Sequence, residues 1–284
     1  MDALQAVILG AIQGLTEFIP ISSSAHLVIL RWFLGWDAHD LVFDVALHMG
    51  TLFALLAYFW REWYGMIKAY FATTRFAKPR EAQELSSTAS EAHGVLLWPI
   101  LFACVPAGLV GVLFEDMAER SFRGRPVLIG ATLIGLGIVL FVADRIGKKT
   151  RPMHSVGLGD WIIIGLAQAL AIVPGVSRSG ITITAGLLCG LQREAAARFS
   201  FLLGAPIIFG AGVFELRRVF LYGLPAREIP PLLLGVATST LIGYLCIRFL
   251  IEYLKKRNMD LFVAYRLVLG AGVIISHALG YLHT

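Results

Sequence analysis

The sequence predicts an all-α polytopic membrane protein with six transmembrane helices plus two re-entrant helical hairpins in an inverted-topology repeat. Of its 284 residues, 57% are hydrophobic and 15% are charged, whereas soluble domains are about 45–50% apolar and about 25% charged. Apolar residues form runs of about twenty, the length that crosses a hydrocarbon core of about 30 Å. Two further apolar regions are interrupted by polar residues, Pro and Gly. These features exclude disordered, collagenous, disulfide-framework and free nucleic-acid-binding classes.

Six uninterrupted apolar stretches are long enough to cross a membrane as helices. They are residues 41–60, 94–114, 126–143, 195–214, 229–250 and 264–283. The one long polar connection, residues 61–93, is expected to be a cytoplasmic loop rather than a separate domain.

The two interrupted regions are expected to be the re-entrant hairpins. Residues 3–36 are interrupted by Glu17–Ser24, and residues 161–190 by Pro174–Gly180. Each half is too short to span a membrane alone, and Pro, Gly or Ser stands where a helix would stop. Irregular backbone at membrane depth is tolerated only inside protein or beside a wet cavity.

The distribution of Lys and Arg predicts the orientation. Loops 61–93, 144–160 and 251–263 fall on one side and hold five, four and three basic residues, twelve together. Loops 115–125 and 215–228 hold three each, and the N-terminal segment adds one, which gives seven. Cytoplasmic loops carry the basic excess, so both termini are expected outside. No signal-peptide pattern precedes the first apolar stretch, so the N-terminus is expected to be retained.

The two interrupted regions resemble each other at an offset of 155 residues. The matching pairs are Gln13 with Gln168, Ser22 with Ser177, Ser23 with Arg178, and Ser24 with Ser179. Within a single membrane domain, 1–284, this predicts one repeat over about 1–143 and a second over about 156–284. Such a repeat places a site near the midplane, where broken helices meet. Chance alignment of Gly/Ser/Leu-rich segments is the alternative.

Ionisable side chains at membrane depth cost roughly 2.5–3.5 kcal/mol on insertion scales, so each is a functional candidate. The ionisable candidates are Glu17, His26, Asp44, His48 and Arg178. The hydroxyl candidates are Thr16, Ser22, Ser23, Ser24, Ser177, Ser179, Thr182 and Thr184. Most of them lie at or beside the two breaks, which the repeat would bring together.

The two breaks have the composition of anion-binding sites. A helix that restarts near Ser22 presents free N–H groups, hydroxyls and the positive end of its dipole. Residues 174–180 offer the same, and Arg178 adds a planar fork that matches a phosphate. Two such sites suit a group with more than one phosphate. Glu17 would repel that group unless it is protonated, bound to a metal or used as a base.

Structural alternatives exist for each of these residues. Ser22–Ser24 could only cap a helix, Arg178 could extend to the interface, and Glu17 could be a hydrogen-bonded structural acid. Asp44 and His48 lie four apart on one helical face and could form a structural pair.

Four stretches resemble the undecaprenyl-pyrophosphate phosphatases linked to bacitracin resistance. They are Gln13–His26, Pro174–Thr182, Phe199–Pro206 and the pair Tyr265 and Arg266. The resemblance implies a bacterial inner-membrane enzyme that removes the terminal phosphate from a C55 polyprenyl diphosphate, giving the lipid carrier of peptidoglycan synthesis. It also implies inverted repeats, a divalent-metal requirement and a site open to the periplasmic face.

Carried over by position, the resemblance assigns site residues in three groups. The catalytic candidates are Glu17, Ser23, His26 and Arg178. The substrate-binding candidates are Gln13, Ser22, Ser24, Ser177, Ser179 and Thr182. Glu17 is the candidate ligand for Mg²⁺ or Ca²⁺. The family often has Glu at position 13, so Gln13 leaves Glu17 to carry the acid–base or metal role alone.

These residues suggest an in-line phosphoryl transfer. Arg178 and the hairpin N–H groups would hold the diphosphate, and Ser23 would attack with Glu17 or His26 taking its proton. Direct attack by His26, or by a water that Glu17 activates, fits the same residues.

The rival class is a polyprenyl-phosphate transporter, because inverted repeats with half-helices at the midplane are also a transporter architecture. An acid-phosphatase-like lipid phosphatase fits less well, since no His follows Arg178 at useful spacing. The expected partners are the polyprenyl diphosphate and membrane lipids, with no nucleic acid, and a homodimer is compatible with the sequence.

Overall fold

The computed structural model describes residues 2–36, 41–74, 97–122, 124–223 and 225–282. Its regular elements over these residues are all helices, and an isolated bridge between Arg151 and Leu191 is the sole extended pairing described there. The predicted all-α class is confirmed, and the apolar helices suit a polytopic membrane protein.

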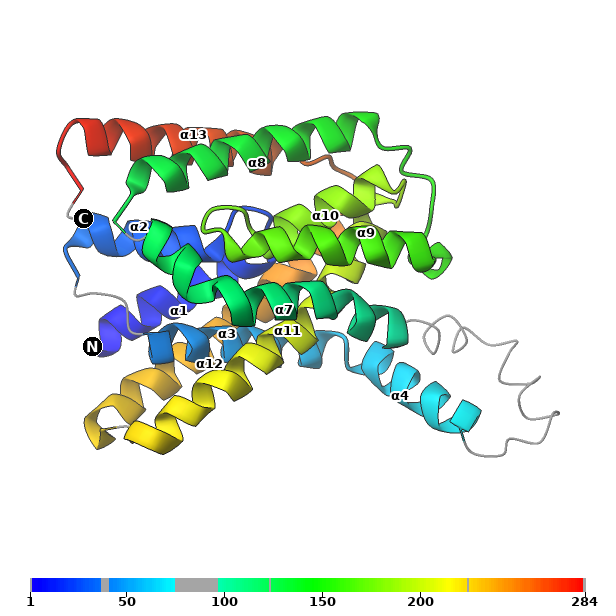
Figure 1. The fold of residues 1–284 in the computed structure, drawn as a ribbon, viewed down its shortest axis with the longest axis horizontal. Coiled ribbons are helices and arrows are strands. Elements are labelled where there is room, and N and C mark those ends of the chain that lie inside the picture. Colours follow the sequence, from blue (N-terminus) through cyan, green and yellow to red (C-terminus); the bar gives the residue numbers. More distant parts are fainter. Residues whose placement is uncertain (1, 37–40, 75–96, 123, 224, 283–284) are drawn as a thin grey trace.

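The helices form two groups along the chain, before and after the connection at residues 147–157 (Figure 1). The first contains α1 (Ala3–Phe18), α2 (Ser23–Leu34), α3 (Leu41–Tyr58), α4 (Trp60–Thr74), α7 (Leu97–Phe122) and α8 (Pro126–Ile146). The second contains α9 (Leu158–Ala169), α10 (Arg178–Leu188), α11 (Arg193–Tyr222), α12 (Ile229–Leu254) and α13 (Asp260–Ala278). Short 3₁₀ turns cover Met153–Ser155, Leu170–Ile172 and Ala226–Glu228.

Five helical segments in the described residues are long and apolar enough to cross a membrane. They are Leu97–Phe114, Pro126–Ile146, Arg193–Glu215, Ala226–Leu254 and Asp260–Ala278. Helices α3 and α4 meet at a bend of 73° and make a sixth if the pair is one span.

The helix ends differ from the sequence prediction, most clearly in three places. Helix α7 continues to Phe122 and α11 to Tyr222, past the apolar stretches that predicted them. The loop expected at 61–93 begins as part of α4, and its residues from 75 onward lie outside the described part of the chain. Hydropathy marks where a chain leaves hydrocarbon, whereas helical hydrogen bonding continues beyond that depth.

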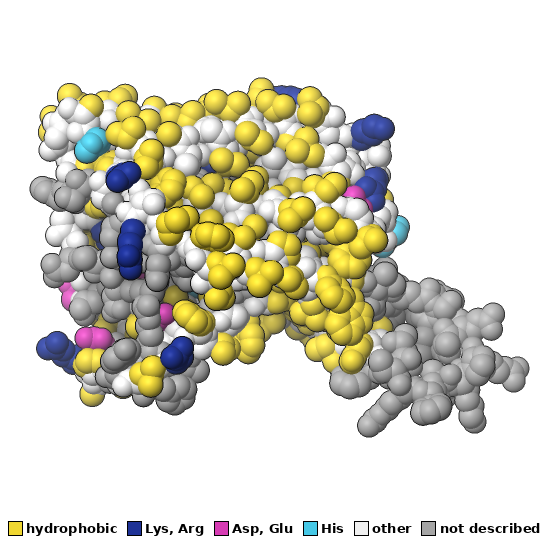
Figure 2. Space-filling model, in the orientation of Figure 1, with side chains coloured by type: hydrophobic (Ala, Val, Ile, Leu, Met, Phe, Trp, Pro, Cys, Tyr) yellow, Lys and Arg dark blue, Asp and Glu magenta, His cyan; other side chains and the backbone are white. Residues whose placement is uncertain are grey.

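The two broken regions are both helical hairpins, and Figure 1 shows that they run in opposite directions. The α1–α2 hairpin starts and finishes at the end of the molecule where α13 also finishes. The α9–α10 hairpin starts and finishes at the opposite end, and the bends of the two hairpins meet in the middle. Hydrophobic side chains cover most of the visible face between these ends, and basic side chains gather toward them (Figure 2).

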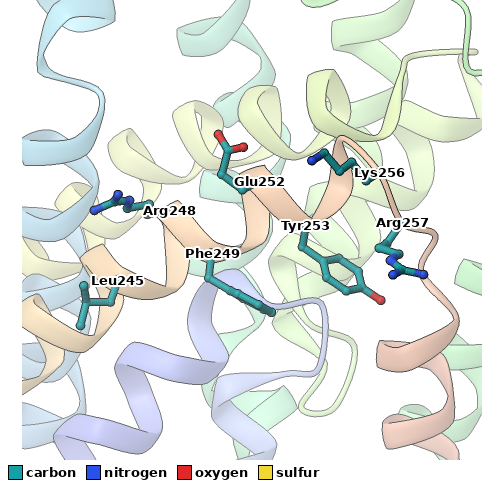
Figure 3. Close-up of a pocket in the computed structure, with 7 residues that line it drawn as sticks. All are labelled: Leu245, Arg248, Phe249, Glu252, Tyr253, Lys256 and Arg257. Carbon is teal, nitrogen blue, oxygen red and sulfur yellow. The ribbon is translucent and has the colours of Figure 1, made fainter.

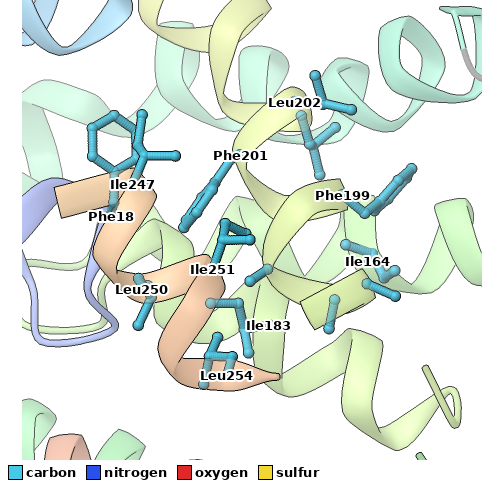
Figure 4. Packing of buried hydrophobic residues seen from close by; sticks show 14 of the residues in the cluster. Phe18, Ile164, Ile183, Phe199, Phe201, Leu202, Ile247, Leu250, Ile251 and Leu254 are labelled. Carbon is cyan, nitrogen blue, oxygen red and sulfur yellow. The ribbon is translucent and has the colours of Figure 1, made fainter. Parts of the chain in front are cut away.

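A buried apolar cluster packs beside the break between α1 and α2 (Figure 4). Phe18 at the end of α1 contacts Phe201 of α11 edge-to-face, with 5.2 Å between ring centroids. Helix α1 packs closely on α12, because a Cβ on Gly14 would lie 2.8 Å from the backbone N of Gly243. Small residues allow such close helix approach in membrane proteins. This packing fixes the end of α1 that carries Glu17.

Candidate functional site

The Glu17 carboxylate lies at the meeting point of the two hairpins and is 6% exposed. It stands in the last turn of α1, where the negative end of the helix dipole disfavours an anion. Donors from several elements compensate. Oε2 accepts a 2.6 Å hydrogen bond from the Ser23 hydroxyl and a 3.1 Å bond from Nε2 of Gln13. Oε1 accepts a 3.0 Å bond from Nη2 of Arg178.

The first break brings Ser23 to Glu17. Ser22 is the N-cap of α2 with a φ of 77°, and its hydroxyl accepts from the N–H of Ala25. The Ser22 hydroxyl also lies 3.3 Å from that of Ser24. A positive φ is uncommon for a non-glycine residue. Here it turns the chain sharply, so that the hydroxyl of Ser23, the first residue of α2, faces the Glu17 carboxylate of α1.

The second break repeats this geometry. Ser177 caps α10 with a φ of 70°, and its hydroxyl accepts a 3.1 Å bond from the N–H of Gly180. The Ser179 hydroxyl lies 3.2 Å from that of Ser177 and donates to the Glu17 carbonyl at 3.1 Å. The matching caps accord with the 155-residue offset found in the sequence. Ser179 also joins the two breaks directly.

Arg178 begins α10 and is aimed at the Glu17 carboxylate. Its Nη1 donates to the Ser200 carbonyl at 3.2 Å, and the hydroxyls of Thr182 and Ser200 lie 2.6 Å apart. The described hydrogen bonds use two of the five N–H groups of the guanidinium. No partner is described for the other three, which makes them candidate donors to an anion.

Both ring nitrogens of His26 have partners other than the Glu17 carboxylate. Its Nδ1 lies 2.7 Å from the Ser22 carbonyl, and its Nε2 lies 2.7 Å from the Tyr265 hydroxyl. A carbonyl only accepts, so Nδ1 carries the proton and a neutral ring accepts from Tyr265 through Nε2. Both ring nitrogens are therefore engaged, and within the described residues neither pairs with Ser23.

His48, a candidate from the sequence that received no role at the site, has its Nε2 3.5 Å from Oε2 of Glu17. The possible pair with Asp44 is described through the backbone, where Nδ1 of His48 faces the Asp44 carbonyl at 2.8 Å. The Asp44 carboxylate is instead bound by both terminal nitrogens of Arg31, at 2.6 and 3.0 Å. The i,i+4 spacing identified a shared helical face, but could not show that Glu17 packs against it.

A separate open hollow of about 600 Å³ lies at the end of α12 (Figure 3). It is lined by Leu245, Arg248, Phe249, Glu252, Tyr253, Lys256 and Arg257. None of these residues belongs to the group around Glu17, so the hollow is distinct from the candidate site.

Comparison with known proteins points to one family. A family described as "Bacitracin resistance protein BacA" matches residues 6–272. A protein of Moorella thermoacetica named undecaprenyl-diphosphatase is 46% identical over 275 residues, 96% of this chain and 97% of its own length. Relatives of the same name from Geobacter metallireducens and Caldicellulosiruptor bescii are 44% and 42% identical. The first covers 97% of this chain and 98% of its own length, the second 98% and 99%. The chain therefore belongs to the bacitracin resistance protein BacA family.

Proposed function

We propose that this chain is a membrane phosphatase that hydrolyses undecaprenyl diphosphate to undecaprenyl phosphate and inorganic phosphate. The observation that carries the proposal is the 2.6 Å hydrogen bond from the Ser23 hydroxyl to the Glu17 carboxylate, with Arg178 on the other carboxylate oxygen. The relatives' name, undecaprenyl-diphosphatase, agrees with this proposal. In a bacterium this reaction supplies the lipid carrier for peptidoglycan synthesis, and the family name links it to bacitracin resistance.

The first chemical step is attack by Ser23 Oγ on the terminal phosphorus. A new Oγ–P bond forms as the bond from phosphorus to the bridging oxygen breaks, and undecaprenyl phosphate leaves. Oε2 of Glu17 takes the hydroxyl proton, since it already accepts that hydrogen bond. A general base must lie within hydrogen-bonding reach of the proton it removes. Among the described residues His26 lacks that contact with Ser23, so Glu17 is the better candidate.

The second step returns the enzyme to its starting state. Water attacks the phosphoserine phosphorus, the Oγ–P bond breaks, and inorganic phosphate leaves. Glu17 passes the proton it holds to Ser23 Oγ, takes a proton from the attacking water and then releases that proton to solvent, which restores the carboxylate. Splitting one displacement into two is the usual reason for a covalent intermediate.

Arg178 and the two helix starts would hold the phosphates. Ser22 and Ser177 begin helices of twelve and eleven residues, whose first N–H groups and dipoles favour anions. The free N–H groups of Arg178 would bind the terminal phosphoryl oxygens and stabilise charge that develops there. Ser24, Ser179 and Thr182 would complete this polar lining.

The residues present fit a hard divalent cation such as Mg²⁺ or Ca²⁺. Within the described residues no group of three His, Cys, Asp or Glu side chains could hold a metal alone. Mg²⁺ commonly takes one or two carboxylates together with substrate phosphate oxygens. Glu17 would provide the carboxylate, and Oε1 of Gln13, which is buried without a hydrogen-bond partner, would provide an amide oxygen. When bound, such a cation would neutralise phosphate charge.

The proposed setting is the bacterial inner membrane, with six spans and two re-entrant hairpins related by an inverted repeat. The opposite directions of the hairpins support it (Figure 1), as does the twelve-to-seven excess of basic residues in the loops at one end. Both termini and the opening of the site would then face the periplasm.

Release of inorganic phosphate from a C55 or C15 polyprenyl diphosphate tests this function. The detergent-purified protein is expected to release phosphate in the presence of Mg²⁺ or Ca²⁺, and EDTA is expected to stop it. Folded protein that releases none would contradict the proposal and favour a lipid transporter, because transport leaves the substrate chemically unchanged.

A further inference from the structure

Arg266 of α13 is a buried cation that the reaction described above does not use. Its side chain is among the largest fully buried ones, at 1% exposure. The hydrogen-bond partners that the structure describes for it are all backbone carbonyls, and they number five. A guanidinium has five N–H donors, so this one is fully satisfied without a carboxylate. A buried guanidinium at membrane depth costs free energy, so Arg266 is expected to have a specific role.

The carbonyls that Arg266 binds come from both hairpin breaks. Nη1 donates to Pro20 at 3.1 Å, and Nη2 donates to Gly175 at 2.7 Å. The Val176 carbonyl oxygen lies 3.4 Å from both Nη1 and Nη2. Pro20 and Val176 stand just before the caps Ser22 and Ser177. One side chain therefore ties together the two segments that lead into the proposed phosphate-binding helices.

Helix α8 completes the support from the other side. Nε of Arg266 donates to the Leu133 carbonyl at 3.0 Å, and the Thr132 hydroxyl donates to the Pro174 carbonyl at 2.8 Å. Gly175 has a φ of +93°, and a Cβ there would lie 2.0 Å from the Thr132 hydroxyl. The second break is thus held by Arg266 of α13 and by Thr132 of α8. Of these two side chains, only Arg266 bonds to the first break.

We propose that Arg266 is a positioning residue for catalysis, which sets the separation and orientation of the two hairpin breaks. The proposal rests on the phosphatase function inferred above. Arg266 would act through the breaks: if they shift, Ser23 on one and Arg178 on the other no longer meet the same phosphoryl group. A misplacement of about 1 Å can cost about a hundredfold in rate.

Arginine is required here because of its shape as well as its charge. Lysine keeps a positive charge but has three donors on one nitrogen. It could not reach carbonyls on two hairpins and α8 together. Arg266→Lys therefore separates charge from geometry.

The test measures kcat and KM together with amide hydrogen exchange in the detergent-purified full chain. Arg266→Lys is expected to lower kcat about a hundredfold and to speed exchange in the segments 20–28 and 174–183. Exchange in α12 should not change, because local opening is reported segment by segment. Arg145→Lys is the control, since Arg145 is half exposed and pairs with Asp260 at the periphery.

A second variant answers the case in which Arg266→Lys does not fold. Thr132→Val removes one hydrogen bond to the second break, and the expected loss in kcat is roughly fivefold to tenfold. Exchange should increase in 174–183 and not in 20–28. Thr238→Val is its control, because the Thr238 hydroxyl only bonds the Leu234 carbonyl in its own helix.

Three outcomes would overturn the positioning role. They are a kcat for Arg266→Lys within threefold of wild type, exchange that rises uniformly along the chain, and a Thr132→Val variant that behaves like its control. A wild-type protein without phosphatase activity contradicts the proposed function instead. The exchange comparison would then still decide whether Arg266 holds the two breaks.

Discussion

The Ser23 hydroxyl lies 2.6 Å from Oε2 of Glu17, although the two residues belong to different helices. Glu17 stands in the last turn of α1 and Ser23 begins α2. In the proposed mechanism, this one short break would supply both the attacking hydroxyl and the base that receives its proton. Arg178, from the other hairpin, supplies the cation that meets the same carboxylate.

Replacing the base should stop the reaction while leaving the fold intact. Glu17→Gln keeps the size of the side chain and one oxygen acceptor, but cannot take the Ser23 proton. We expect kcat to fall by about 10²–10⁴, the range for general base catalysis. Thr238→Val is the control, because the bond described for the Thr238 hydroxyl is to the Leu234 carbonyl in its own helix. Equal activity of Glu17→Gln and the control in a phosphate-release assay would exclude Glu17 as the base.

The guanidinium fork of Arg178 should not be replaceable by an ammonium group. Arg178→Lys keeps the charge but loses paired donors toward the phosphoryl group, and loss of one such donor costs about 10²–10³ in kcat. Arg198→Lys is the control, since Arg198 pairs with Glu62 and Glu194 outside the site. Full turnover by Arg178→Lys would show that only the charge is needed.

Metal dependence should respond to a carboxylate at position 13. Gln13→Glu adds a second carboxylate beside Glu17. Since the number of charged ligands tunes cation affinity, the concentration of Mg²⁺ or Ca²⁺ that gives half-maximal activity should fall by roughly tenfold. Activity is measured against metal concentration after EDTA treatment. An unchanged metal dependence would argue that position 13 does not contact the cation.

Stability should depend on pH through the ion pair that anchors the end of the second hairpin farthest from its break. Both terminal nitrogens of Arg151 bind the Asp160 carboxylate, at 2.6 and 2.8 Å. The hydrogen bond from Arg151 is the main cause that lowers the pKa of Asp160 below its usual value. A lowered carboxylate pKa stabilises the folded state above the unfolded pKa of about 3.9. That stability is lost as pH falls through the folded value.

Thermal unfolding in detergent, measured between neutral pH and about pH 3, checks whether stability falls with pH in this direction. The wild type should lose stability below about pH 4, and Asp160→Asn should start less stable and lose less. Parallel curves for the two proteins would show that Asp160 does not contribute through its charge.

Most of the helical organisation could be predicted because hydropathy reports it directly. The interruptions at 17–24 and 174–180 correspond to real breaks, since Pro and serine caps have local structural effects that a sequence displays. The bend between α3 and α4, and the extension of α7 to Phe122, were not predicted. Both depend on how the helices leave the apolar layer, which an apolar window does not report.

The candidate site could be predicted in part for a similar reason. The close approach of Glu17, Ser23 and Arg178 follows from two motifs whose residues stand out against an apolar background. His48 and Tyr265 reach the site or its neighbours only through tertiary packing. The contacts of Arg266 are with backbone carbonyls, which carry no sequence signal. The repeat boundaries and the metal stay predictions.

The most direct test of the account is the turnover of Ser23→Ala on a C55 diphosphate, compared with Thr238→Val in the same assay. Loss of the attacking atom should lower kcat by at least about a thousandfold, since removing the nucleophile of other enzymes lowers kcat by up to about 10⁶. Substrate binding should persist, because Arg178 and the helix starts remain. A Ser23→Ala enzyme that turns over within tenfold of wild type would contradict the account and assign the attack to His26 or to water.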